Sequence, residues 1–177
     1  IIKQDLLRID EAIKNNTLSK NILIDKFIRD VLDNKGVVHL IGLVSDGGVH
    51  SKDTHILELS KILVKRKLKV IIHAFTDGRD TLPKTALKTL TKFNEKLPAG
   101  AIIGTVMGRF YPMDRDYRWE RISVAWKAIA LGKAQYHSKC LKNLIQEAYN
   151  RGETDEFISP TILENKNNCK YGGINNG

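Results

Sequence analysis

The sequence predicts an α/β fold, a three-layer domain in which helices flank both faces of a mostly parallel sheet. Three short apolar runs, at residues 37–44, 69–76 and 101–107, are rich in branched side chains and have the composition of strands that are buried on both faces. A stretch with helical periodicity follows each run, and this alternation is the pattern of right-handed βαβ units around a parallel sheet. The length of 177 residues fits a single domain.

The helices are predicted from apolar residues that recur at three- and four-residue spacing. In chain order they cover residues 3–14, 20–34, 51–66, a stretch that opens at Thr81 and Pro83, 119–131 and 138–150. Pro83 suits a first helical turn because an N–H at that position would have no helical partner. Trp119 and Trp126 are seven residues apart, which predicts that both pack into the core. His39 and His73 lie inside strands and are predicted to be packed or hydrogen-bonded core residues.

The composition is that of an ordinary globular domain with an excess of positive charge. Hydrophobic residues make up 42% and charged residues 28%, and 29 Lys and Arg against 20 Asp and Glu give a formal net charge of +9. This charge suits an anionic partner, such as nucleic acid or a small phosphorylated or carboxylated molecule. The two cysteines cannot form a disulfide framework, no apolar run approaches the ~18 residues of a membrane span, and the first residues show no signal-peptide pattern. We therefore expect a soluble, cytoplasmic domain with no membrane partner.

The start of the sequence suggests that the chain is a piece of a longer protein. It begins at Ile1, without a methionine and directly in a helical pattern. Residues 164–177 are polar and rich in Asn and Gly, and we interpret them as a surface loop or a truncated end. This leaves residues 1–163 as the domain.

The candidate site lies in the loops that follow the three strands. Ligands of open parallel sheets bind outside the carboxyl ends of the strands, and these loops contain His50, Arg79, Asp80, Arg109 and Arg115. Five of the nine arginines lie between residues 79 and 121, whereas the 20 lysines are spread mostly over the helices. A guanidinium group binds carboxylate and phosphate in a bidentate way that lysine cannot. The segregation of arginine therefore favours a small, multiply anionic ligand.

These charged residues also have a structural interpretation. The arginines could pair with Asp114, Asp116 and Glu120 in a surface network. Asp80, kept ionised by a neighbouring arginine, could accept a proton from a hydroxyl group, or it could cap the helix that follows. The sequence pattern leaves both alternatives open.

At the three loops the sequence resembles a known enzyme family. The match is carried by the segments LIGLVSDGGVHS, HAFTDGRDTLP and MGRFYPMDRDYRWERI, and by the flanking segments QDLLRIDEAI and DEFISPTIL. The three loop segments are similar to the substrate-binding segments of cofactor-independent phosphoglycerate mutase, the metal-dependent type that needs no bisphosphoglycerate. The resemblance runs from about Gln4 to Leu163, and three long motifs in the right order make it specific.

The resemblance implies an isomerase of two domains that interconverts 3-phosphoglycerate and 2-phosphoglycerate through a phosphoserine intermediate. In that family a phosphatase-like domain carries the nucleophilic serine and two manganese ions (Mn²⁺), and a second domain, inserted into the first, holds the glycerate. The chain looks like the inserted domain alone. We therefore expect no metal or other cofactor in it, the missing phosphatase-like domain as its partner, a monomer, and no activity of the chain by itself.

The same resemblance implies roles for the loop residues. By motif position, the substrate-binding residues are His50, Arg79, Asp80, Arg109 and Arg115. The arginines would hold the carboxylate and the phosphoryl group, and His50 would form a hydrogen bond to an oxygen. Asp80 would be the catalytic residue, which moves protons on the glycerate hydroxyls.

Two other functions are considered for the chain. The first is a basic module that binds nucleic acid or another polyanion, which predicts a continuous lysine-rich face and an affinity that falls steeply with salt. The second is a scaffold domain without a ligand, which predicts that the arginines at the strand ends are all paired internally.

Overall fold

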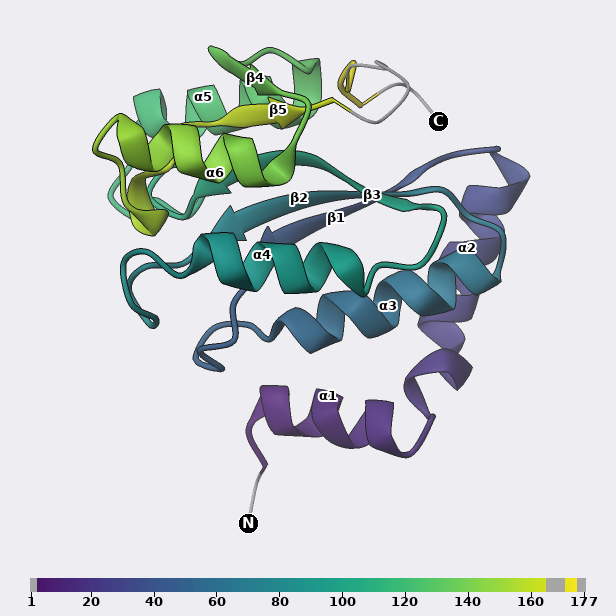
Figure 1. The fold of residues 1–177 in the computed structure, drawn as a ribbon. Helices are drawn as coiled ribbons and strands as arrows, with labels where there is room; N and C mark the ends of the chain where they lie inside the picture. Colours follow the sequence, from purple (N-terminus) through teal and green to yellow (C-terminus); the bar gives the residue numbers. More distant parts are fainter. Residues whose placement is uncertain (1–2, 165–170, 175–177) are drawn as a thin grey trace.

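The computed structural model describes residues 3–164 and 171–174. In these residues the sheet has five strands, which confirms the predicted α/β fold. The strand order is β1-β2-β3-β5-β4 (Figure 1). The strands are β1 (Val38–Leu43), β2 (Val70–Thr76), β3 (Ala101–Gly108), β4 (Tyr136–Ser138) and β5 (Thr161–Leu163). Strands β1, β2 and β3 are the three predicted strands and pair in parallel, whereas β5 is antiparallel to β3 and parallel to β4. The prediction missed β4 and β5, which are three residues each.

The described part of the chain also contains six α-helices and two 3₁₀ turns. They are α1 (Asp5–Lys14), η1 (Leu18–Lys20), α2 (Ile22–Asp33), α3 (Asp53–Lys65), α4 (Ala86–Glu95), α5 (Trp119–Leu131), α6 (Leu141–Asn150) and η2 (Asp155–Phe157). Of these, α1, η1 and α2 precede β1, and the others lie between strands. The helix predicted to open at Thr81 and Pro83 begins instead at Ala86. The backbone N–H groups of Thr85 and Ala86 at its start donate to the carboxylate of Asp155, which is distant in sequence. The local sequence therefore does not determine where this helix begins.

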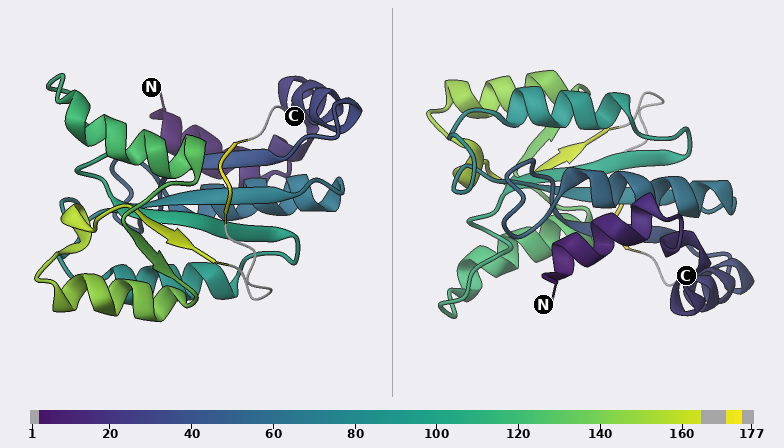
Figure 2. Two further views of the ribbon diagram at one scale, coloured as in Figure 1. Left: turned by 90° about the horizontal axis from the view of Figure 1, so that it is seen from above. Right: turned by 90° about the horizontal axis from the view of Figure 1, so that it is seen from below.

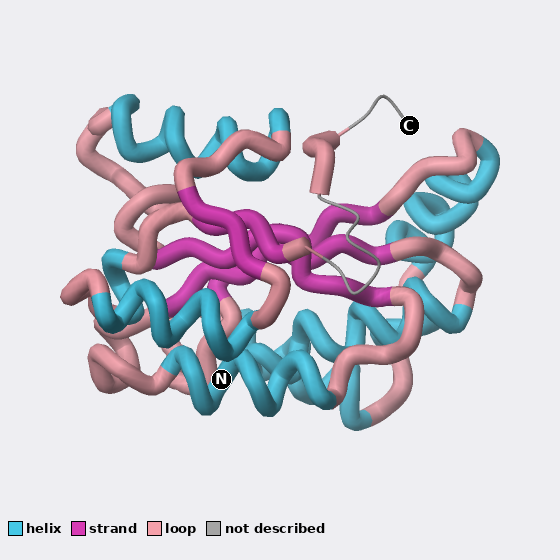
Figure 3. The backbone as a smooth tube through the Cα atoms, turned by 45° about the horizontal axis from the view of Figure 1, so that its top comes forward, coloured by secondary structure: helices cyan, strands magenta, loops and turns pink. Residues whose placement is uncertain are grey.

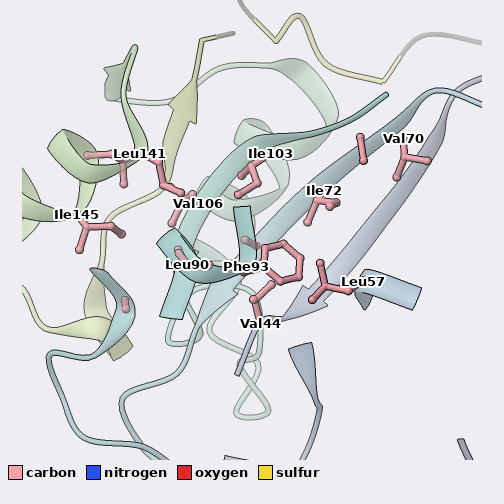
Figure 4. Close-up of a cluster of buried hydrophobic side chains, with 14 of the residues drawn as sticks. Val44, Leu57, Val70, Ile72, Leu90, Phe93, Ile103, Val106, Leu141 and Ile145 are labelled. Carbon is pink, nitrogen blue, oxygen red and sulfur yellow. The ribbon is translucent and has the colours of Figure 1, made fainter. Parts of the chain in front are cut away.

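The larger hydrophobic core lies on one face of the sheet, beneath α3, α4 and α6. Ile72 and Val106 of the sheet share this cluster with Leu63 of α3, Phe93 of α4 and Ile145 of α6. All five are at most 1% exposed. Figure 4 shows part of the cluster, with Ile72, Val106, Phe93 and Ile145 labelled. Helix α1 packs on the outside of α3, away from the sheet (Figure 2). A core of this size fixes the strands, and with them the loops at their carboxyl ends.

Helix α5 covers part of the opposite face, which completes the three layers (Figure 3). It contacts the sheet through the small residues Ala125 and Ala128. Trp119 and Trp126 are 67% and 54% exposed, so the prediction that they pack into the core is wrong. The seven-residue spacing does place both on one side of the helix, but that side faces away from the sheet.

His73 is a core residue, as predicted, whereas His39 is only half-buried and lies stacked against the His73 ring. His73 is fully buried, and its ring nitrogens lie 3.0 Å from His39 Nδ1 and 2.9 Å from Thr105 Oγ1. Burial and the neighbouring His39 lower the pKa of His73 to about 3. The ring of Tyr171 packs edge-on against His73, and its hydroxyl donates to the backbone oxygen of Ile129 (2.6 Å).

Part of the predicted polar segment 164–177 therefore packs on the domain, since Tyr171 is buried there. Residues 171–174 cross the sheet on the same face as α5 (Figure 2). The predicted loop or truncated end at 165–170 and 175–177 lies outside the described residues.

Candidate functional site

The loops after β1, β2 and β3 meet at one edge of the sheet, because the carboxyl ends of parallel strands lie on the same side. Figure 1 shows the arrowheads of β1 and β2 pointing to this edge. A cavity of about 460 Å³ opens between the loops, and all five predicted site residues line it. The full set is His50, Arg79, Asp80, Arg109, Phe110, Met113, Asp114, Arg115, Asp116, Arg118, Arg121, Glu156 and Phe157.

At the base of the cavity Arg109 is buried between two carboxylates. Its Nη1 donates to Asp77 Oδ1 and to Asp80 Oδ2, both at 2.7 Å. Burial alone would lower the pKa of Arg109, but the hydrogen bonds to Asp80 and Asp77 outweigh it and raise the pKa. Because Asp80 holds Arg109, it does not cap the following helix, and Asp155 takes that place.

Asp77 holds Arg109 and the turn after β2 in place at the bottom of the cavity. It was not among the predicted site residues. Its Oδ1 accepts the backbone N–H groups of Arg79 (3.2 Å) and Asp80 (3.0 Å), which forms the turn after β2, and its Oδ2 accepts the hydroxyl of Ser45 (2.5 Å). Burial raises the pKa of Asp77, but the hydrogen bonds from Ser45, Asp80, Arg109 and Arg79 outweigh it and lower the pKa. Asp77 is therefore ionised at neutral pH and holds both the turn and Arg109.

His50 and Arg79 lie higher on the cavity wall and are more exposed. His50 Nε2 is 3.8 Å from Asp80 Oδ2, which is beyond hydrogen-bond distance. Arg79 Nε is 3.8 Å from Glu156 Oε1, and the Arg79 side chain is 60% exposed. Contacts between exposed polar side chains at such distances contribute little to stability, so both side chains are free to turn toward a ligand.

The loop after β3 is shaped by Asp114. Its Oδ2 accepts the backbone N–H groups of Asp116 (3.1 Å) and Arg118 (2.8 Å), and its Oδ1 lies 3.4 Å from Arg121 Nη1. The Arg121 guanidinium stacks over the Phe110 ring, 3.7 Å from its centroid. The side chain of Arg121 is thus held both by a carboxylate and by an aromatic face.

Arg115 and Arg118 form no ion pair within the described residues. Of the three acids that could have formed a surface network, Asp114 alone pairs with an arginine of residues 109–121 in the described part of the chain, and that arginine is Arg121 in the first turn of α5. Two arginines at the cavity are therefore available to an anion, which the scaffold interpretation does not predict.

Among the residues that build the cavity, Asp77, Arg118, Arg121, Glu156 and Phe157 were not predicted as site residues, and neither were Phe110, Met113, Asp114 and Asp116. All but Glu156 and Phe157 stand in the segments that the sequence analysis had selected. Glu156 and Phe157 come from η2, far along the chain, and the signal for them was the matching segment DEFISPTIL, to which the sequence analysis gave no role.

No group of three or more His, Cys, Asp or Glu within residues 3–164 and 171–174 could hold a metal ion. The manganese ions that the resemblance implies therefore have no ligand set in these residues. Over the same residues, no helix is long and apolar enough to cross a membrane.

Comparison with known proteins gives a consistent set of relatives. The model of the family described as BPG-independent PGAM N-terminus (iPGM_N) matches residues 9–177. The chain is 48% identical over 166 residues to 2,3-bisphosphoglycerate-independent phosphoglycerate mutase 1 of Methanosarcina acetivorans, which covers 92% of the chain and 32% of that protein. It is 44% identical over 173 residues to the corresponding enzyme of Lawsonia intracellularis, covering 96% of the chain and 34% of the relative.

The fold matches a solved structure as well. The crystal structure of Leishmania mexicana phosphoglycerate mutase at low cobalt concentration superposes with a TM-score of 0.84 and 30% sequence identity. The match covers 98% of this chain and 33% of that one. The chain thus spans about a third of the length of the relatives it matches.

Proposed function

Because the chain belongs to the family of 2,3-bisphosphoglycerate-independent phosphoglycerate mutases, we propose that it is the substrate-binding part of an isomerase that interconverts 3-phosphoglycerate and 2-phosphoglycerate. Residues 1–163 would form the core of the inserted domain. The nucleophilic serine and the residues that bind two manganese ions would belong to the phosphatase-like remainder of the enzyme. The chain alone would then bind substrate without converting it.

The observation that carries the proposal is the cavity at the strand ends. A phosphoglycerate has a phosphoryl group and a carboxylate, so it needs at least two separate cationic contacts. Arg115 and Arg118 provide arginine groups that no acid in the described residues occupies, and Arg79 is held only loosely. Arg109 is buried and fixed by two carboxylates, so its guanidinium needs no reorganisation when a ligand enters.

Each predicted residue has a role that its position supports. We assign the phosphoryl group and the carboxylate to the arginines 79, 109 and 115, whose planar groups suit both anions. His50, exposed at the rim, would form a hydrogen bond to a substrate oxygen. Asp80 would accept and return protons of the glycerate hydroxyls, since its second oxygen is not taken by Arg109.

Phosphoryl transfer depends mainly on positioning and on stabilising charge, and little on covalent chemistry supplied by the protein. An arginine-lined cavity would position the glycerate and stabilise its negative charge while the glycerate turns between its two phosphorylated forms. When bound, manganese would supply Lewis-acid stabilisation of the phosphoryl oxygens. In the proposed full-length enzyme that function would belong to the phosphatase-like domain.

Calorimetric titration of the full-length enzyme with 3-phosphoglycerate tests the proposal. Arg115→Ala should weaken binding about tenfold or more, as expected for one charged hydrogen bond. Lys92→Ala, which removes an exposed helical lysine, is the matched control and should bind as wild type does. Equal effects of the two variants, or a preference for heparin or DNA over 3-phosphoglycerate, would favour the basic-module alternative.

Monomeric state and cytoplasmic location belong to the same proposal. Light scattering coupled to size-exclusion chromatography would test the first, and cell fractionation would test the second.

A further inference from the structure

The segment from Asp155 to Phe157, η2, forms one wall of the cavity although it belongs to none of the three strand-end loops. Glu156 and Phe157 line the cavity, where Glu156 faces Arg79 and the Phe157 ring packs 5.0 Å from that of Phe110. A single 3₁₀ turn has almost no stability of its own. Its position must therefore come from contacts with the rest of the domain.

These contacts converge on Asp155, which is 1% exposed. Its Oδ2 accepts the backbone N–H groups of Thr85 (2.7 Å) and Ala86 (2.8 Å), at the start of α4. Its Oδ1 accepts the hydroxyl of Tyr149, at the end of α6, at 2.5 Å. Burial and this hydrogen bond raise the pKa of Tyr149, so the hydroxyl remains a donor. One carboxylate thus joins α4, α6 and η2.

The backbone of η2 is fixed as closely. The Asp155 N–H donates to Pro83 O (2.8 Å), and its carbonyl oxygen accepts the hydroxyl of Thr76 (2.6 Å), at the end of β2. The Phe110 N–H donates to Glu156 O (3.1 Å). At Gly108 a Cβ atom would lie only 2.2 Å from Glu156 O, so η2 can take this position only because residue 108 has no side chain.

We propose that Asp155 is a positioning residue for the substrate cavity: its buried carboxylate holds η2 against the ends of β2 and β3, and so places Glu156 and Phe157 beside Arg79 and Phe110. The proposal rests on the proposed function only in taking 3-phosphoglycerate as the ligand. Without the carboxylate, the first turn of α4 loses its cap and η2 loses its anchor on α6. The wall beside Arg79 would then move outward, and the ligand would meet a wider cavity.

The test compares Asp155→Ala with Asn21→Ala in the full-length enzyme. Asn21 is the matched control because it also caps a helix, accepting the N–H groups of Leu23 (2.9 Å) and Ile24 (3.3 Å), but it is exposed and does not line the cavity. A loss of folded protein lowers the apparent kcat and leaves KM unchanged. We expect Asp155→Ala to raise KM for 3-phosphoglycerate about tenfold or more, since a displacement of about 1 Å can have effects of this size.

Asp155→Asn should restore most of the affinity. Its amide oxygen can still accept the two N–H groups of α4, and its amide nitrogen can donate to Tyr149, whose hydroxyl then acts as acceptor. Amide hydrogen exchange gives a second readout that needs no ligand. Exchange at Phe110, whose N–H is bonded to Glu156, should become faster in Asp155→Ala and remain unchanged in Asn21→Ala.

A KM of Asp155→Ala equal to that of Asn21→Ala would overturn the proposal and leave Asp155 an ordinary helix cap. Arg115→Ala in the same panel separates this outcome from failure of the proposed function, because it changes affinity only if the cavity binds the substrate. If Asp155→Ala does not fold, Thr76→Val decides in its place. That near-isosteric change removes the hydroxyl that donates to the Asp155 carbonyl at 2.6 Å and to Met107 O at 3.3 Å, and an unchanged KM would count against the proposal.

Discussion

Replacement of Arg109 by lysine tests how the charge at the base of the cavity is used. In the structure one nitrogen, Nη1, binds two carboxylates at once, Asp77 and Asp80, each at 2.7 Å. The side chain is 9% exposed, so water cannot replace a lost contact. Lysine keeps the charge but loses the planar group whose remaining N–H donors can bind a carboxylate or phosphoryl group.

The expected size of the effect follows from these contacts. A hydrogen bond to a charged group contributes about 1.5–3 kcal/mol, and each 1.4 kcal/mol is about tenfold in rate. Arg109→Lys should therefore lower kcat/KM of the full-length enzyme about ten- to several-hundred-fold, nearly as much as Arg109→Ala. Stability should distinguish the two variants. Arg109→Ala leaves Asp77 and Asp80 without a cation and should cost about 3–5 kcal/mol, whereas Arg109→Lys should cost less.

Steady-state kinetics and urea unfolding of both variants, with Lys92→Ala as control, are the measurements required. In urea unfolding the stability loss should appear as a lower denaturation midpoint of this domain in Arg109→Ala. An Arg109→Lys enzyme within threefold of wild type in kcat/KM would refute the reasoning, because a point charge would then be sufficient. An unchanged urea midpoint in Arg109→Ala would refute the claim that the two carboxylates depend on this arginine.

Three further predictions concern the rest of the chain. The chain alone, supplied with manganese, should convert no 3-phosphoglycerate in a coupled assay, and measurable turnover would contradict the assignment of the nucleophile and metal site to the remainder of the enzyme. The pKa of His73 is lowered to about 3 from 6.5, so between these values the unfolded state binds a proton that the folded state does not. The free energy of unfolding should therefore fall as pH drops below about 6.5, by about 1.4 kcal/mol per pH unit for one proton. Urea unfolding at pH 5.0 to 7.5 checks this, and a stability that does not change with pH would count against it. Trp119→Phe and Trp126→Phe should each change the free energy of unfolding by less than about 0.5 kcal/mol, since both rings are exposed, and a loss of several kcal/mol would show that they are packed after all.

The sequence predicts the parts of the fold that have strong local patterns. The three long strands are continuous apolar runs and were found within one or two residues. Strands β4 and β5 have three residues each, too few for a pattern, and they form only because β5 pairs with β3 across more than 50 residues of chain. The predicted start of α4 was wrong for a similar reason, because the residue that caps this helix, Asp155, is distant in sequence.

Helix α5 shows why periodicity alone misassigned the tryptophans. Its spacing correctly indicates one face for Trp119 and Trp126, but the sheet is approached by Ala125 and Ala128. Small residues let the helix backbone lie close to the sheet, and no hydrophobicity pattern distinguishes that face from one bearing large rings. Which face is buried was decided by tertiary packing.

For the candidate site too, the sequence predicts the parts with a local signal and misses those that depend on distant contacts. The rule that ligands bind at strand ends brought His50, Arg79, Asp80, Arg109 and Arg115 to one cavity. Their roles as substrate ligands are still predictions. The rule could not predict the cavity wall formed by η2, because nothing in the local sequence of that segment indicates that it packs against the ends of β2 and β3.

The position of η2 has a consequence for how the protein is made. Thr76 and Asp155, which are joined by a hydrogen bond, are 79 residues apart in sequence. During synthesis the three parallel strands and all their loops emerge from the ribosome before η2 does, and domains fold as the chain emerges. For that interval the arginines at the strand ends lack one wall of their cavity, with Gly78 and Gly108 uncovered. A nascent chain stalled before residue 155 would thus carry every predicted ligand and still bind poorly, so binding competence should appear as one step late in the synthesis of this domain.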